Sequence, residues 1–119
     1  MININNIKNK SVKYLKGNTK NIEILLKSYV NKIHSIFHFG EFARIYQSFK
    51  RIDECFSSNI EGSSSVFNFA LKNKIRFIYS ATSASLGNKG EDMNLSPYAF
   101  SKAKNLELLE NLRKWFGFR

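Results

Sequence analysis

Hydrophobic residues follow two different rhythms along this 119-residue chain. Residues 11–18 (SVKYLKGN) alternate apolar and polar side chains and stop at a Gly-Asn pair, which predicts a short strand followed by a turn. Residues 35–40 (SIFHFG) and 75–81 (IRFIYSA) are short apolar runs of the kind found in buried strands. The pattern therefore predicts three strands.

Three further segments carry apolar residues at helical spacing. Residues 19–33 have Thr19 available as the N-cap of a helix. Residues 53–73 contain a glycine and a serine run with weak helix propensity, so burial must stabilise a helix there. A third helix begins at Ser96 and Pro97, because Ser96 can cap and proline suits the first helical position. The predicted buried faces are Ile22, Leu25, Leu26 and Val30; Phe56, Ile60, Phe67, Ala70 and Leu71; and Leu106, Leu109 and Leu112.

The predicted order of strand and helix, repeated three times, indicates an α/β fold with a parallel sheet and helices packed on its faces. A chain that is 43% hydrophobic and 14% aromatic can form one compact domain, which we place at residues 11–119. Residues 1–10 are predicted to be irregular or disordered. No run approaches the roughly 18 apolar residues of a membrane span, and residues 1–10 lack a signal peptide's apolar segment. We therefore predict a cytoplasmic protein with no membrane partner.

Charge and cysteine content narrow the possible functions further. The net charge is +10, but the 19 Lys and Arg residues are spread along the whole chain. This distribution favours a solvated basic surface, and a nucleic-acid-binding module stays as the alternative. Cys55 is the only cysteine, which excludes an internal disulfide and fits a reducing compartment. His38 lies in an apolar run without spaced acidic or cysteine ligands, so we predict a buried structural histidine.

Candidate chemistry lies in residues 96–104 (SPYAFSKAK), where Tyr98 and Lys102 are one helical turn apart. A nearby cation favours the phenolate, so Tyr98 could accept a proton near neutral pH. Thr82 directly follows the predicted strand 75–81, at the carboxyl end of a strand, where ligands bind in open α/β folds. Its hydroxyl could bind the same substrate oxygen. Ordinary helices also contain Tyr and Lys at this spacing, and that alternative stays open.

Five segments in a consistent order resemble the extended short-chain dehydrogenase/reductase superfamily, in its nucleotide-sugar epimerase and dehydratase branch. They span residues 11–118 and so cover nearly all of the chain. The segments are KGNTKN (16–21), IFHFGE (36–41), SSNIEGSSSVFNFA (57–70), YSATSASLG (79–87) and LSPYAFSKAKNLELLENLRKWFGF (95–118).

The resemblance implies a partial Rossmann-like domain of an NAD-dependent enzyme that acts on a nucleotide sugar, with a homodimer as a possible assembly. Tyr98 matches the catalytic base, Lys102 the residue that binds the nicotinamide ribose and favours the phenolate, and Thr82 the third catalytic residue. Asn18 matches a residue beside the adenine. The full set of positions that match cofactor contacts is Asn18, Phe39, Gly40, Glu41, Asn59, Tyr98 and Lys102.

Two departures from the family pattern limit what this chain is expected to do. It has no glycine-rich turn after a first strand to hold the cofactor diphosphate. We therefore expect a fragment, without the first strands and the C-terminal substrate lobe, that is not active alone. Thr82 is followed by Ser83 and Ala84, where dehydratases of this branch have an Asp-Glu pair. This favours an epimerase, with a dehydratase or a reductase as the alternative.

Overall fold

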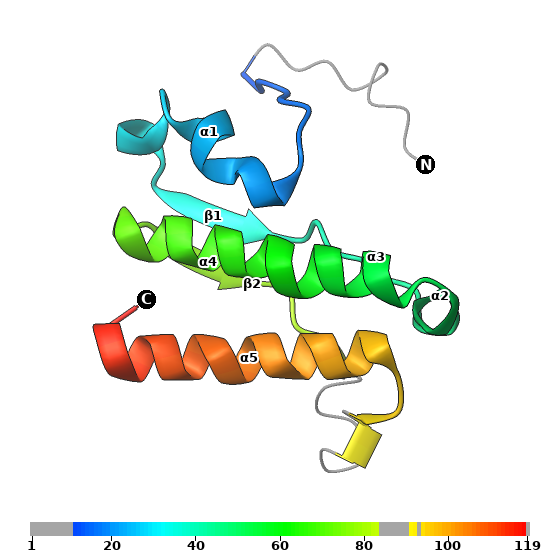
Figure 1. Cartoon of the computed structure of the whole chain (residues 1–119). Coiled ribbons are helices and arrows are strands. Elements are labelled where there is room, and N and C mark those ends of the chain that lie inside the picture. The colour runs from blue at the N-terminus through cyan, green and yellow to red at the C-terminus, as the bar shows by residue number, and fades with distance from the viewer. Residues whose placement is uncertain (1–10, 84–90, 93, 119) are drawn as a thin grey trace.

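Two short parallel strands lie at the centre of the computed structural model, which describes residues 11–83, 91, 92 and 94–118 (Figure 1). Strand β1 (Ser35–His38) pairs with β2 (Arg76–Tyr79), and the register places Ser35 opposite Arg76 and His38 opposite Tyr79. Both strands lie inside the predicted runs 35–40 and 75–81. The predicted α/β fold with a parallel sheet is therefore confirmed.

The strand predicted at residues 11–18 is wrong. Residues 12–18 have no regular secondary structure, and in the described part of the chain the sheet contains only β1 and β2. An alternating segment becomes a strand only when a neighbouring strand accepts its backbone hydrogen bonds. Without such a neighbour, the apolar side chains Val12, Tyr14 and Leu15 stay about half exposed.

The helix predicted over residues 19–33 is interrupted. It consists of a 3₁₀ turn, a short α-helix and a second 3₁₀ turn, which are Thr19–Asn21, α1 (Ile22–Leu26) and Val30–Lys32. Asn18 rather than Thr19 caps the first turn, because its Oδ1 accepts a hydrogen bond from the Lys20 amide at 2.9 Å. The predicted buried face is largely present, since the core packs against Ile22, Leu26 and Val30.

The helix predicted over residues 53–73 is present, and a π-helical stretch divides it. Its parts are α3 (Ile52–Phe56), the π-helix Ser57–Gly62 and α4 (Ser63–Lys72). A separate helix that the pattern did not predict, α2 (Ile45–Lys50), precedes it. Burial stabilises the weak segment as expected, because Gly62, Ser63, Val66 and Phe67 are all buried.

The longest helix is α5 (Pro97–Phe116), and its start is the predicted one. The Ser96 Oγ accepts a hydrogen bond from the Ala99 amide at 3.0 Å, and Pro97 occupies the first turn. The helix ends at Gly117, which has the left-handed conformation that glycine adopts at low cost. Beyond it, Phe118 joins the buried core with Phe69, Ala70 and Ile75.

The two faces of the sheet have different surroundings. Helices α4 and α5 lie across one side of the strands (Figure 1), where the Phe67 ring lies 5.1 Å from the Phe77 ring and 5.7 Å from the Tyr79 ring. Phe37 points to the opposite face and is 63% exposed beside a shallow hollow of about 760 Å³. None of the helices in the described residues is long and apolar enough to cross a membrane.

Candidate active site

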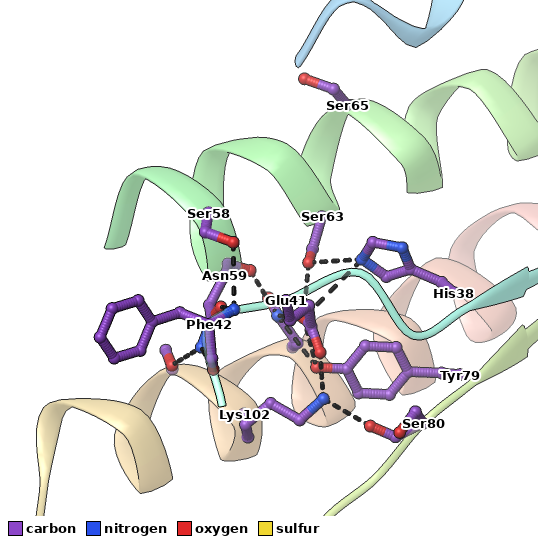
Figure 2. A network of polar contacts seen from close by, with 12 residues as sticks. His38, Glu41, Phe42, Ser58, Asn59, Ser63, Ser65, Tyr79, Ser80 and Lys102 are labelled. Atoms are coloured by element: carbon purple, nitrogen blue, oxygen red, sulfur yellow. Dashed lines mark hydrogen bonds and ion pairs between the residues drawn. The ribbon is translucent and has the colours of Figure 1, made fainter. Parts of the chain in front are cut away.

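Glu41 is the centre of a buried polar cluster beyond the carboxyl end of β1 (Figure 2). Its side chain is only 3% exposed, although the residue lies in a loop. One carboxylate oxygen, Oε1, accepts hydrogen bonds from Ser63 Oγ at 2.6 Å, the Tyr79 hydroxyl at 2.9 Å and Asn105 Nδ2 at 3.2 Å. A charge can stay buried when it is hydrogen-bonded and paired in this way.

The cation that pairs with Glu41 is Lys102 from the second turn of α5. Its ammonium forms an ion pair with Glu41 Oε2 and donates to the Ser80 carbonyl just beyond β2. The Lys102 side chain is 4% exposed, and its Nζ lies 4.3 Å from the centre of the Tyr79 ring. Two of the three ammonium hydrogens are therefore used by Glu41 and Ser80.

The other titratable groups of the cluster, His38 and Tyr79, are neutral. Burial lowers the pKa of His38, and this effect outweighs the opposing attraction of Glu41. Burial also raises the pKa of Tyr79 far above its ordinary value. His38 Nε2 lies 2.9 Å from Ser63 Oγ, whose hydroxyl already donates to Glu41, so Nε2 carries the hydrogen in this contact. His38 is thus the buried structural histidine that the sequence predicts.

Asn59 connects the loop after β1 to the helices. It is fully buried in the π-helix, and its Oδ1 accepts from the Phe42 amide at 2.7 Å while its Nδ2 donates to Ser101 Oγ at 3.0 Å. The Asn59 carbonyl also accepts from Asn105 Nδ2 at 2.6 Å. The predicted place of Asn59 near a cofactor stays a prediction, since these contacts hold its side chain within the protein.

The predicted catalytic residues lie on α5 and in the segment just beyond β2. Tyr98 is partly buried in the first turn of α5, where its amide donates to Ser48 Oγ at 3.3 Å. Thr82 is partly buried two residues after Ser80, whose carbonyl binds Lys102. Within the described residues, no hydrogen bond joins the Tyr98 hydroxyl to Lys102, whose ammonium binds Glu41 and Ser80. The joint action of Tyr98, Lys102 and Thr82 stays a prediction.

Two of the predicted cofactor contacts, Asn18 and Gly40, line one hollow of about 660 Å³. A Cβ atom added to Gly40 would meet nothing within 4 Å, so the backbone there is open to the hollow. Phe39 is 68% exposed, whereas Glu41 turns its side chain into the buried cluster. The complete lining is Gly17, Asn18, Thr19, Gly40, Asp53, Glu54, Ser57 and Ser58.

This arrangement agrees with a match in sequence to a known family. The family model of the NAD dependent epimerase/dehydratase family matches residues 3–119. The chain belongs to this family. No protein with curated annotation matches the chain in sequence.

Solved structures of the epimerase/dehydratase type share the fold. A UDP-glucose 4-epimerase from Brucella ovis in complex with NAD has a TM-score of 0.79 at 19% identity, over 90% of this chain and 36% of its own. A UDP-glucose 4-epimerase from Thermus thermophilus in complex with NAD has a TM-score of 0.79 at 17% identity, over 94% and 40%. A double mutant of a dTDP-glucose 4,6-dehydratase from Streptomyces venezuelae has a TM-score of 0.81 at 17% identity, over 92% and 37%.

These likenesses confirm the predicted partial Rossmann-like fold. The chain spans between about one third and two fifths of the length of the solved structures described above. Epimerases and a dehydratase both occur among them, so the fold does not separate the two reactions.

The residues that line the hollow at Asn18 and Gly40 fit the adenosine half of NAD, the family's cofactor. The amide of Asn18 and the hydroxyls of Ser57 and Ser58 suit the polar groups of an adenosine, and the open backbone at Gly40 leaves room for it. The lining contains no Lys or Arg but two carboxylates, Asp53 and Glu54. The part of the hollow that is described therefore suits adenosine better than a diphosphate.

Sequence reasoning missed the buried partners of Glu41. Asn105 lies three residues after Lys102, and Ser63 lies four residues after Asn59, so each shares a helix face with a predicted site residue. That spacing is a signal that could have found both. Tyr79 gave no comparable signal, because its position in an apolar strand is typical of an ordinary core residue.

Proposed function

We propose that this chain is the catalytic part of an NAD-dependent enzyme that inverts a hydroxyl-bearing carbon of a nucleotide sugar. The observation that supports this proposal best is the position of Tyr98 and Lys102 on the first two turns of α5, where Lys102 binds the Ser80 carbonyl just beyond β2. Ligands of open α/β folds bind at this end of the sheet. The family match supports the NAD dependence.

In the proposed reaction, Tyr98 accepts the proton of a sugar hydroxyl. Thr82, close behind β2, donates a hydrogen bond to the same oxygen and keeps it in place. Bound NAD would accept the hydride from the carbon that carries this hydroxyl. Inversion then requires the sugar to rotate in the site, so that the hydride returns to the opposite face of the same carbon.

Lys102 contributes a fixed hydrogen-bond donor. Glu41 and the Ser80 carbonyl occupy two of its ammonium hydrogens, and no described residue accepts a hydrogen bond from the third. We assign this hydrogen to a ribose hydroxyl on the nicotinamide side of the cofactor. Asn18 and Gly40, which line the hollow of about 660 Å³, would contact the adenosine side.

Epimerisation is favoured over dehydration by the residues that follow Thr82. Elimination of water from a sugar needs an acid and a base near the leaving hydroxyl. The sequence has Ser83 and Ala84 at these two positions, and neither side chain is a carboxylate. A dehydratase or a reductase is the second candidate, because a dehydratase is among the similar structures.

The proposal is tested by titrating the ¹⁵N-labelled chain with the two halves of NAD and recording ¹H–¹⁵N NMR spectra. Nicotinamide mononucleotide should shift the amide signals of Tyr98 and Thr82. Adenosine monophosphate should shift those of Asn18 and Gly40 instead. Separate mononucleotides avoid the need for a site that holds the intact diphosphate.

Two variants complete this test. Tyr98→Phe keeps the ring and removes the hydroxyl, so it should weaken the response to a mixture of nicotinamide mononucleotide and UDP-glucose. The matched control is Tyr46→Phe, since Tyr46 is 71% exposed on α2. The proposal fails if neither mononucleotide shifts the amide signal of any of these four residues at millimolar concentration. It also fails if both mononucleotides shift the same signals, scattered over the surface of the chain.

A further inference from the structure

One face of the two-stranded sheet is open. Phe37 and Ile78 are opposite each other in the parallel register, so both side chains point to this face. They line the hollow of about 760 Å³ together with Lys32 and Arg76, which lie near the amino ends of the strands. Phe77, the neighbour of Ile78 in β2, points to the other face and packs against the buried core. We call the surface formed by Lys32, Phe37, Arg76 and Ile78 the open face.

A parallel sheet with an open face is unusual, because parallel strands occur almost only in sheets that helices cover on both faces. In this chain β1 and β2 are parallel, and on the other face Phe67 of α4 packs against the ring of Phe77. Exposed apolar patches with a polar rim mark binding surfaces for partners. Phe37 is 63% exposed, so the open face has the apolar centre of such a surface.

The rim of the open face is positively charged. Residues 24–40 and 62–90, which contain both strands, include no Asp or Glu. Within the part of the chain that the structure describes, neither Lys32 nor Arg76 forms an ion pair, and both residues are exposed. A partner that places carboxylates beside these two cations would therefore complement the charge of the rim.

The same charges disfavour a second copy of the chain as the partner. Two copies joined through their open faces would bring Lys32 and Arg76 of both into one interface, and each copy carries a net charge of +10. Nucleic acid is disfavoured for a different reason. Its protein interfaces are much more positively charged than a face with two cations around an apolar centre.

We propose that the open face binds an amphipathic helix of a partner protein, with apolar residues over Phe37 and Ile78 and carboxylates beside Lys32 and Arg76. Helices are the elements that cover parallel sheets, and an amphipathic helix can lie in an apolar groove by its apolar side. Each strand has four residues and is about 13 Å long, a distance that about nine helical residues span. This inference does not depend on the proposed function, because no residue of the open face belongs to the candidate active site.

The probe is a fluorescein-labelled helical peptide of about 18 residues, long enough to extend beyond both ends of the strands. It has a stripe of leucines flanked by glutamates, and the control peptide has the same leucines flanked by lysines. Fluorescence anisotropy against the whole chain should show binding of the glutamate peptide that is at least about tenfold tighter than binding of the lysine peptide. In ¹H–¹⁵N NMR spectra the glutamate peptide should shift the amide signals of Phe37 and Ile78.

Two pairs of variants separate the open face from the general positive charge of the chain. Arg76→Glu and Arg113→Glu change the net charge equally, but Arg113 lies in the last turn of α5. Phe37→Ser and Phe49→Ser each remove an exposed ring, and Phe49 lies on α2. Arg76→Glu and Phe37→Ser should each weaken binding of the glutamate peptide by at least about tenfold, whereas their controls should change it by less than about twofold.

Four results would overturn the proposal. The first is that the glutamate peptide does not bind, or that a variant of the open face weakens binding no more than its control. The second is a discrete dimer at micromolar concentration in analytical ultracentrifugation that Phe37→Ser abolishes, which would assign the face to a second copy. The third is that a DNA duplex binds more tightly than the peptide and depends on Arg76 but not on Phe37.

The fourth result is a set of amide shifts in wild type that leaves out Phe37 and Ile78. Because this measurement needs no substitution, it decides the question if a variant does not fold, as judged by circular dichroism. A negative result in the mononucleotide titration leaves all of these measurements unaffected, since no nucleotide takes part in them.

Discussion

Replacing Lys102 with methionine tests how much the buried ion pair contributes to folding. The variant keeps the aliphatic part of the side chain and removes the ammonium, which leaves the Glu41 carboxylate 3% exposed and without a cation. Removing one partner of a buried ion pair typically costs about 3–5 kcal/mol. Three donors still bind the carboxylate, from Ser63, Tyr79 and Asn105. We therefore expect the lower end, about 3 kcal/mol, against a total stability of about 5–15 kcal/mol for a typical domain.

Urea unfolding followed by circular dichroism at 222 nm measures this loss. With a slope of about 1–3 kcal/mol per molar urea, the midpoint should fall by roughly 1–3 M. The double variant Glu41→Gln/Lys102→Met should recover at least half of the loss, because no unpaired charge stays buried. Glu54→Gln is the control for an exposed pair and should leave the midpoint unchanged. The reasoning fails if Lys102→Met shifts the midpoint no more than this control does, or if the double variant is less stable than either single variant.

Three further predictions concern the frame around the site. Because burial lowers the pKa of His38, this histidine binds a proton more readily in the unfolded chain than in the folded one. The free energy of unfolding should therefore decrease as the pH falls from about 7.5 to 5. The urea midpoint of His38→Gln should decrease less over this pH range than that of wild type. The decrease in His34→Gln should equal that of wild type, since His34 is exposed. Ser96→Ala removes the N-cap of α5 and should cost about 0.5–2 kcal/mol in the same assay. Phe67→Ala empties a fully buried position between α4 and the strands and should cost about 3–5 kcal/mol, measured as a loss of thermal stability. A cost for Phe67→Ala similar to that of an exposed residue such as Phe49 would contradict the described core.

The parts of the fold that the sequence predicts correctly are those with local signals. The start of α5 depends on Ser96 and Pro97, which act within their own turn. The runs that become β1 and β2 are short and apolar, which is a local signal for strands, although Phe37 of β1 stays 63% exposed. The strand predicted at residues 11–18 fails for the opposite reason. Its alternation is a permissive signal, and a strand also needs a partner that lies elsewhere in the chain.

The candidate site shows the same division. The spacing of Tyr98 and Lys102 on one helix is readable from the sequence, and α5 carries both residues in its first two turns. The pairing of Glu41 with Lys102 joins residues 61 positions apart, so no local pattern contains it. Asn18 and Thr19 are both good N-cap residues, and only the geometry of the chain shows that Asn18 is the cap. Tertiary contacts, rather than local preferences, decide such details.

The face of the sheet to which Phe37 points offers a way to reduce self-association of the protein. Phe37 gains little from folding while it stays 63% exposed, and among the described rings it stacks only on that of Phe39, which is itself 68% exposed. A change of either ring to serine or lysine should therefore leave the folded chain almost as stable, while it reduces self-association at the concentrations that NMR requires. Light scattering of wild type and Phe37→Lys at matched concentrations would show the improvement.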